Sequence, residues 1–310
     1  MFQKTLKLIF TQRKPLTPKL GMFFSVLGIA LLILAYTALA YAETDTIPPM
    51  PRFPLVPKFD RLYEGLKLLV FLDPQSGDYI FWKDFLVSGP RLLIAVGGTS
   101  LLCVTVGIYM GLYDFLRRMC LPIMEIVEHI PANGMMIFFL ALFHTSNPLF
   151  WGVMAFGICV GITKNVYLDS KSVSDEHVFT AKTLGASEQE VTWYVVFPQI
   201  IPQIIEAVRQ SISPAIVFLM GTEWIVGSDG IGHRFMQLNR SPRAFMTFPY
   251  VMALGLIGLF ISYAFRKIQR VSCPWHENET PPDFVDRFLA RMKNNIQTLM
   301  RHERKKETAS

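Results

Sequence analysis

A few ionisable residues lie in or beside long apolar runs of this sequence, where a charge is costly. Glu223 and Arg209 share one such run, and Glu128 precedes Pro131 at the start of another. Because ionisable groups in lipid are expensive, each indicates a polar pathway through a membrane or a structural ion pair. These four residues are our candidates for a translocation pathway. The alternatives are a structural pairing of Glu223, with Arg209 or with backbone near Gly230, and interfacial solvation of Glu128.

The sequence offers no residue set for catalysis. The six histidines lack metal-ligand spacing, and the four cysteines contain no C-x-x-C pair. A G-x-x-x-x-G-K-[ST] motif is missing, so any ATP must bind to another protein. For an intramembrane enzyme, Glu128 and His129 would be the only candidate pair, without a partner cluster. We therefore expect no catalytic residue, metal or cofactor in this chain.

The composition is that of a membrane protein. Of 310 residues, 51% are hydrophobic and 17% are charged, whereas soluble domains carry about 25% charge. The net charge of +6 gathers beside the apolar runs instead of forming a basic face with interleaved aromatics. This distribution excludes nucleic acid as a partner and points to membrane lipid.

Apolar runs long enough to cross a bilayer predict an all-α protein with six transmembrane helices. The runs are residues 21–42, residues 92–113, two helices within 130–163 separated by the turn formers 144–148, residues 201–225 and residues 248–265. Basic residues before the first run and after the last place both termini in the cytoplasm, with the chain in the inner membrane. The alternative for the first run is a cleaved signal peptide, because residues 38–43 resemble a signal-peptidase site.

Five segments follow from these runs: a cytoplasmic segment 1–20, the first helix 21–42, a periplasmic segment 43–88 with a short amphipathic helix near 59–71, a core 89–270 with five transmembrane helices, and a basic cytoplasmic tail 271–310. Apolar residues at helical spacing in the tail predict either an amphipathic helix on a membrane or partner, or a solvated tail. Gly107 and Gly111 form a G-x-x-x-G motif, which lets helices approach closely.

The core contains one large polar loop, residues 166–200, predicted to be cytoplasmic. Within it we expect two short helices: Asp175 caps the first, and Gly185 ends it in a left-handed conformation. Ser187 and Glu190 have the spacing of a capping box that opens the second helix, which we expect Pro198 to end. A compact polar hairpin of this kind is typical of a protein-docking element.

Residues 179–198 resemble the cytoplasmic "EAA" loop of ABC-importer permeases, E-A-A-x-x-x-G-x9-I-x-L-P. Ala181, Gly185 and Pro198 match the second Ala, the Gly and the Pro, with Val195 and Phe197 at the Ile and Leu positions. The resemblance continues beyond the loop, where the sequence is similar to the nitrate/sulfonate/taurine/bicarbonate branch of binding-protein-dependent permeases. The residues that carry it there are Pro198-x-x-x-Pro202, Arg209, Glu223 and Gly230-Ile-Gly232.

The resemblance implies a type I ABC importer permease fold and alternating access driven by ATP and Mg in a separate cytoplasmic ATPase. It also implies a periplasmic or lipid-anchored solute-binding protein, a second permease copy in a homodimer, and a small anion or small polar solute. The implied ATPase-coupling residues are Glu176, Phe179, Thr180, Ala181, Leu184, Gly185, Ala186 and Pro198. Ala181 and Leu184 would form the face against the ATPase, or else pack on the permease itself.

The loop departs from the family pattern at its first two positions, where Phe179 replaces the acid and Thr180 the first Ala. Glu176, one helical turn upstream, could supply the missing charge, or Phe179 could act as a hydrophobic plug. The departures also leave open a permease-like membrane sensor or anchor. Three arginines between the last two runs could attract anions, bind an acidic docking protein or be ordinary loop residues: Arg234, Arg240 and Arg243.

Overall fold

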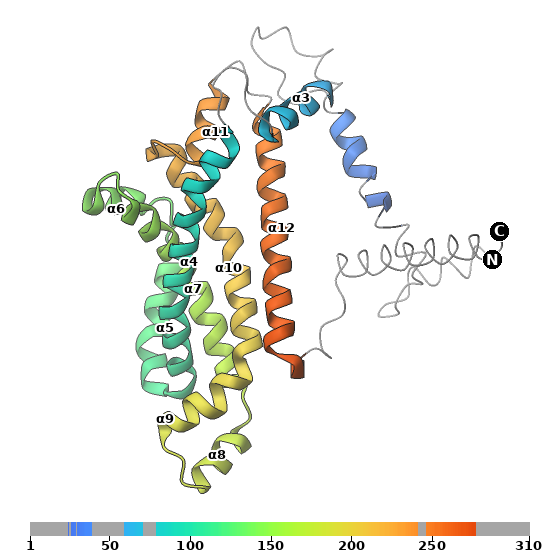
Figure 1. The fold of residues 1–310 in the computed structure, drawn as a ribbon. Helices are drawn as coiled ribbons and strands as arrows, with labels where there is room; N and C mark the ends of the chain where they lie inside the picture. The colour runs from blue at the N-terminus through green and yellow to red at the C-terminus, as the bar shows by residue number, and fades with distance from the viewer. Residues whose placement is uncertain are drawn as a thin grey trace, which may run out of the picture. The chain divides into compact units, whose positions relative to one another are not determined.

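The computed structural model describes residues 24, 26–28, 30–38, 59–70, 79–240 and 246–276. Its described residues form helices and turns without strands, which confirms the all-α prediction (Figure 1). The predicted segments 1–20 and 43–58, the tail beyond residue 276 and Arg243 lie outside the described residues, as do both ends of the first run.

Four helical stretches in the described part of the chain are long and apolar enough to cross a membrane. They are α4 (Ile80–Leu112), α7 (Asn147–Ser172), the stretch Glu188–Val226 that ends in α10 (Phe197–Val226), and α12 (Thr247–Ser272). The shorter apolar helix Val26–Ala38 lies within the first predicted run. The count of six crossings stays a prediction.

The predicted helix that begins at residue 130 takes a different form. Helix α5 (Asp114–Glu128) precedes it, residues 129–135 form turns, and α6 (Met136–Phe143) has only 8 residues. At 1.5 Å per residue α6 is about 12 Å long, too short to cross a bilayer alone. Pro131 therefore lies in a break between helices, and a turn at residues 144–146 separates α6 from α7.

Helix α4 starts at Ile80, before the residue 89 boundary expected for the core. A helix, α3 (Phe59–Val70), lies where the sequence predicts a short amphipathic helix near 59–71. The start of α4 was misplaced because a charge-free run cannot include Asp84 or Arg91. Both side chains are paired inside the fold, as described below, so their charges do not end the helix.

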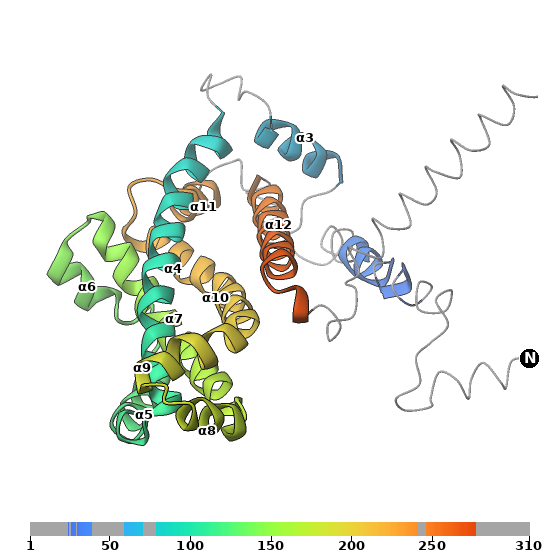
Figure 2. The same ribbon diagram turned by 60° about the horizontal axis from the view of Figure 1, so that its bottom comes forward.

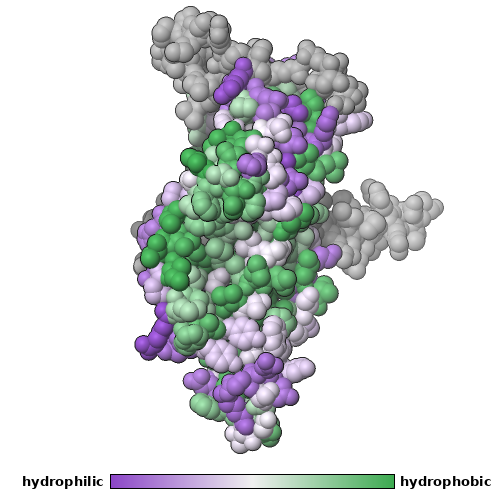
Figure 3. All heavy atoms as spheres, turned by 90° about the vertical axis from the view of Figure 1, so that its left-hand side faces the viewer, coloured by the Kyte–Doolittle hydropathy of each residue, from purple (hydrophilic) through white to green (hydrophobic). Residues whose placement is uncertain are grey.

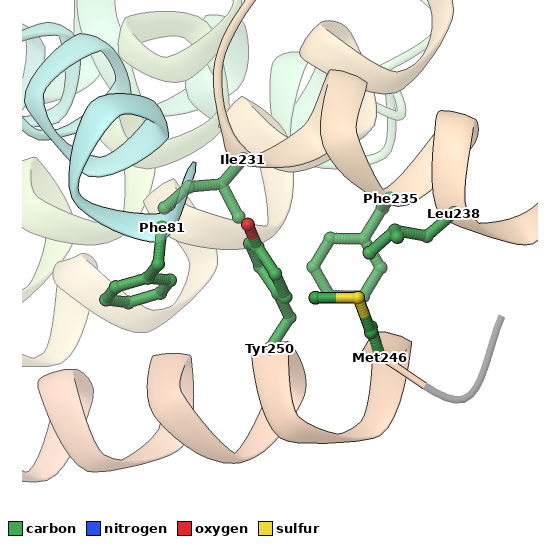
Figure 4. Packing of buried hydrophobic residues seen from close by; sticks show 6 residues of the cluster. All are labelled: Phe81, Ile231, Phe235, Leu238, Met246 and Tyr250. Atoms are coloured by element: carbon green, nitrogen blue, oxygen red, sulfur yellow. The ribbon is translucent and has the colours of Figure 1, made fainter. Parts of the chain in front are cut away.

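The chain divides into two compact units, one of residues 1–99, 128–158 and 213–258 and the other of residues 100–127, 159–212 and 259–310. The first unit has a core around Tyr250, which is fully buried (Figure 4). The Tyr250 ring meets Phe81 edge-on at 5.5 Å and Phe235 at 6.0 Å between ring centroids. This core joins the start of α4, the start of α12 and α11 (Ile231–Asn239).

In the second unit, α4 and α7 approach closely along the predicted glycine motif. A Cβ atom added at Gly107 would lie 2.8 Å from Cβ of Val166 and 3.0 Å from the Thr163 carbonyl oxygen. One added at Gly111 would collide with Ser170. The motif therefore has the packing role that its spacing predicted, because only glycine fits this helix contact.

Replacing Gly107 with Val should destabilise the protein by about 1–3 kcal/mol, since the added methyl groups must push α4 and α7 apart. The measurement is the unfolding midpoint of the purified protein in mild detergent. Gly98→Val, on the same helix, is the matched control, because nothing lies within 4 Å of a Cβ there. Equal midpoints for the two variants would contradict the packing role.

Candidate functional site

A helical hairpin follows α7, and its first arm is α8 (Asp175–Thr183) (Figures 1 and 2). Ser174, and not Asp175, is its N-cap, because the Ser174 hydroxyl accepts the backbone N–H of Glu176. Asp175 is the first helical residue, where a carboxylate still favours the positive end of the helix dipole. The predicted cap was thus one residue too late.

The first arm ends as the sequence predicted. Gly185 has φ of +90°, in the left-handed region. Its N–H donates to the Lys182 carbonyl and the Ala186 N–H donates to the Ala181 carbonyl, both at 3.0 Å. This pair of bonds is a Schellman motif, which uses the last carbonyls of the helix to turn the chain.

The second arm starts with the predicted capping box. The Ser187 side chain accepts the Glu190 N–H, and the Glu190 carboxylate accepts the Ser187 N–H at 2.8 Å. Lys182 and Glu188 join the two arms with an ion pair of 2.7 Å. The conformation of the hairpin is therefore stabilised by helix caps on both sides of the turn and by the Lys182–Glu188 ion pair between its arms.

Pro198 does not end the second arm. Helix α9 (Glu188–Glu190) runs through the π-helix η1 (Val191–Val196) into α10, whose second residue is Pro198. In the wider π register, the Phe197 N–H bonds to the Thr192 carbonyl five residues back. This local widening accommodates the missing N–H and the ring of Pro198, which would interrupt an ordinary α-helix.

The hairpin exposes large apolar side chains to its surroundings. Leu184 at the turn is 83% exposed, Phe179 on α8 is 66% exposed and Tyr194 on η1 is 79% exposed. Ala181 is half-buried, whereas Leu184 is almost fully exposed. Of the other candidates, Glu176, Thr180 and Gly185 are exposed, and Ala186 and Pro198 are half-buried. In Figure 3, hydrophilic residues gather at the lower end of the molecule, where Figure 1 places α8.

In the first unit, Glu223 on α10 is fully buried. Its carboxylate accepts hydrogen bonds from the Ser88 hydroxyl at 2.8 Å, from Arg91 Nη1 at 3.0 Å and from the Gly232 N–H at 2.9 Å. The Ser88 oxygen in turn accepts the Ile231 N–H at 2.9 Å. A buried charge with these partners is satisfied, so the geometry supports the structural alternative for Glu223.

Two glycines after α10 are required by this arrangement. Gly230 has φ of +97°, and a Cβ there would lie 2.5 Å from Glu223 Oε1. The backbone turn thus closes directly over the carboxylate and aims the Gly232 N–H at it. The Gly230-Ile-Gly232 pattern is the backbone half of the Glu223 site.

Arg91 is the cation of the site. Besides Glu223, it contacts Asp229 Oδ1 at 2.8 Å and Asn147 Oδ1 at 3.0 Å, and its guanidinium lies 4.2 Å from the centroid of the Phe150 ring. Arg209, the other suggested partner, pairs with Glu206 on its own helix. Arg209 and Glu223 are 14 residues apart in the sequence of α10. Of the two structural partners suggested for Glu223, the structure shows backbone near Gly230, through the Gly232 N–H, and not Arg209.

Glu128 ends α5 and is exposed, and Pro131 is exposed in the break that follows. The structure therefore places the four pathway candidates in three settings: a buried cluster for Glu223, an ion pair on the helix for Arg209, and an exposed helix break for Glu128 and Pro131. Their role in a pathway stays a prediction.

The sequence interpretation missed Asp84, Ser88 and Arg91. They are spaced by four and three residues, which puts them on one face of α4. That periodicity, just before an apolar run, was the available signal. Asp84 accepts hydrogen bonds from Arg234 Nε at 2.8 Å and from the Tyr250 hydroxyl at 3.2 Å. The positive charge of Arg234 is therefore paired with Asp84, which weakens the hypothesis that Arg234 attracts anions.

No group of three or more His, Cys, Asp and Glu side chains within the described ranges could hold a metal ion. The two sites can do different things. The hairpin can bind another protein, because it is exposed and its turn is capped on both sides. The Glu223 cluster can hold α4, α10 and α11 together, because its charges are satisfied within the protein.

A family described as binding-protein-dependent transport system inner membrane component matches residues 103–275. The taurine transport system permease protein TauC of Escherichia coli (strain K12) is 25% identical over 214 residues, 68% of this chain and 77% of TauC. The formylaminopyrimidine transport permease protein ThiX of Halalkalibacterium halodurans is 22% identical over 200 residues, 61% of this chain and 78% of ThiX.

Among solved structures, a chain of the inward-facing MetNI methionine ABC transporter aligns with a TM-score of 0.58 at 13% identity. The alignment covers 63% of this chain and 96% of that one. At this identity the likeness concerns the fold, and it confirms the fold expected for an ABC importer permease. The family match covers more than half of the sequence, so this chain belongs to the binding-protein-dependent transport system inner membrane components and is a permease subunit of an ABC importer.

Proposed function

We propose that the hairpin of residues 174–198 is the coupling element on which a separate cytoplasmic ATPase acts. The observation that carries this proposal is a stiff, doubly capped turn with Leu184 at its tip, 83% exposed. Burying such a leucine in a partner groove stabilises the complex by roughly 1.5–3 kcal/mol.

The hairpin is also connected so that it can transmit a displacement. Its second arm continues without a break from Glu188 to Val226. The π-helix η1 lies at the base of this arm, where a π segment often marks a functional site. A push on the hairpin would therefore act directly on the start of α10, which fits alternating access.

Phe179 occupies the acidic position of the family loop. Because it is 66% exposed, we favour the hydrophobic plug over a charge supplied by Glu176. The ATPase groove for this permease would then be apolar opposite Phe179. ATP and Mg would be bound by the ATPase subunit.

The transported solute belongs, in this proposal, to the small anions or small polar metabolites. The names of TauC and ThiX refer to taurine and formylaminopyrimidine, which are both small and polar. The permease would act as a homodimer in the inner membrane with both termini cytoplasmic, and receive solute from a periplasmic or lipid-anchored binding protein.

Leu184→Asp tests the docking role. It should lower co-purification of the ATPase by roughly 10-fold or more, because it replaces a buried apolar contact with a desolvated charge. Leu184→Met is the matched control and should retain assembly. The second measurement is solute-stimulated ATP hydrolysis in proteoliposomes that contain the whole complex.

Unchanged assembly of the Leu184→Asp variant would contradict the docking role. An ATPase that binds the wild-type permease without solute-stimulated hydrolysis would instead identify a sensor or anchor, and overturn the transport proposal.

A further inference from the structure

The last two turns of α12 carry a basic stripe beside a cavity of about 260 Å³. The cavity is lined by Tyr263, Arg266, Lys267, Arg270 and Val271. Their spacings of three, one, three and one residues put all five on one face of the helix. The stripe contains three cations and no carboxylate.

The same face is apolar one turn earlier. Leu259 is 60% exposed and Phe260 is 70% exposed, and they precede Tyr263 by one helical turn. Along this face the chain therefore passes from aliphatic and aromatic side chains, through a tyrosine, to cations. Tyrosine prefers the boundary between hydrocarbon and headgroups, and cations beyond it face the headgroup layer.

An ion pair on α10 lies near the stripe and adds no net charge to it. On α10, Arg209 is paired with Glu206, and Arg266 also acts electrostatically on Glu206. The Gln269 side chain donates to the Pro202 carbonyl at 3.0 Å, which fixes this end of α12 against α10.

We propose that this stripe is a binding site for the phosphate headgroup of an anionic phospholipid, with its acyl chains along Leu259 and Phe260. The occupant is a lipid because the charged cavity continues directly into the apolar face of a membrane-crossing helix. One water fills about 30 Å³ of liquid, so the cavity has room for a phosphate group and bound waters. The proposal is independent of the coupling role of the hairpin.

The test is retention of phosphatidylglycerol by the purified full-length protein in detergent, measured by native mass spectrometry. Lys267→Gln with Arg270→Gln should lower retention about 25-fold, because each cation near an anionic headgroup contributes roughly fivefold. Arg266 is kept because it also interacts with Glu206. Lys267→Arg with Arg270→Lys should retain the lipid.

Arg117→Gln with Arg118→Gln is the matched control. It removes the same charge from a pair of arginines that Asp114 already compensates, with Arg118 Nε 2.6 Å from Asp114 Oδ2. It should change retention little. An equal loss in this control would show non-specific attraction and overturn the site.

Two further outcomes would overturn the proposal. In the first, inorganic phosphate and a short-chain phosphatidylglycerol displace the bound lipid equally well. This result would show that the site binds free phosphate. In the second, the variant with Lys267→Gln and Arg270→Gln retains the lipid unchanged but forms fewer dimers. This result would show that a second copy of the chain covers this face. Displacement only by the short-chain lipid supports the proposal.

Discussion

Replacing Gly185 with Val should abolish assembly with the ATPase while the permease still inserts in the membrane. A β-branched residue at φ of +90° costs about 1–3 kcal/mol, which the rest of the hairpin must absorb. Nothing lies within 4 Å of a Cβ at this position, so the whole effect would come from the backbone. Losing the left-handed turn would break the Schellman bonds and move Leu184 away from its partner.

The measurements are co-purification of the ATPase and membrane fractionation of the permease. Gly185→Asn is the matched control, because asparagine tolerates the left-handed region better than other residues do, and it should keep most of the assembly. Val at Gly161 serves as a second control, since it adds the same bulk where nothing lies within 4 Å and φ is ordinary. If Gly185→Val assembles as well as the wild type, the hairpin is not the coupling element.

Arg91→Met should destabilise the permease by about 3–5 kcal/mol, the largest stability effect that we expect from one substitution. It leaves the Glu223 carboxylate buried without its cation, and breaking a buried pair costs more than removing it. Met preserves much of the aliphatic bulk against Phe150. The unfolding midpoint in detergent measures the change.

The double variant Arg91→Met with Glu223→Gln separates lost charge from lost packing. It should recover most of the stability, because the Gln amide oxygen can still accept from Ser88 and Gly232 while no lone charge stays buried. Asp229, the second carboxylate partner of Arg91, has 52% of its side chain exposed and can be solvated by water. Arg118→Met, at an exposed ion pair, is the control and should change stability little. A double variant no more stable than Arg91→Met would rule out the charge explanation.

The two sites lie at different positions on the long helix that ends in α10. Its start is the hairpin arm, and its end is the Glu223 cluster that binds α4 and α11. Gly185→Val should therefore impair coupling without a large loss of stability, and Arg91→Met should lower stability first. A combined variant should show the sum of both effects, since the sites share no partner.

The sequence by itself determined what depends on local chemistry. Apolar runs identified the helices α7, α10 and α12 because a bilayer requires about 20 apolar residues in one helix. The positive-φ requirement of Gly185 and the Ser187–Glu190 spacing identified the hairpin, since caps use only neighbouring residues. Family membership followed from the same short segment and was confirmed.

Only the tertiary structure decided which distant residues meet. The cation that pairs with Glu223 is Arg91, more than a hundred residues earlier in the sequence. Arg91 and Asp84 were both missed because the predicted span on α4 was ended at its first charged residue. The helix continues through Pro198 because residues 191–196 form a π-helix, which helix propensities of single residues do not predict. The physical reason is the same in both cases: a charge or a proline is tolerated inside a helix only when the surrounding fold supplies what it lacks.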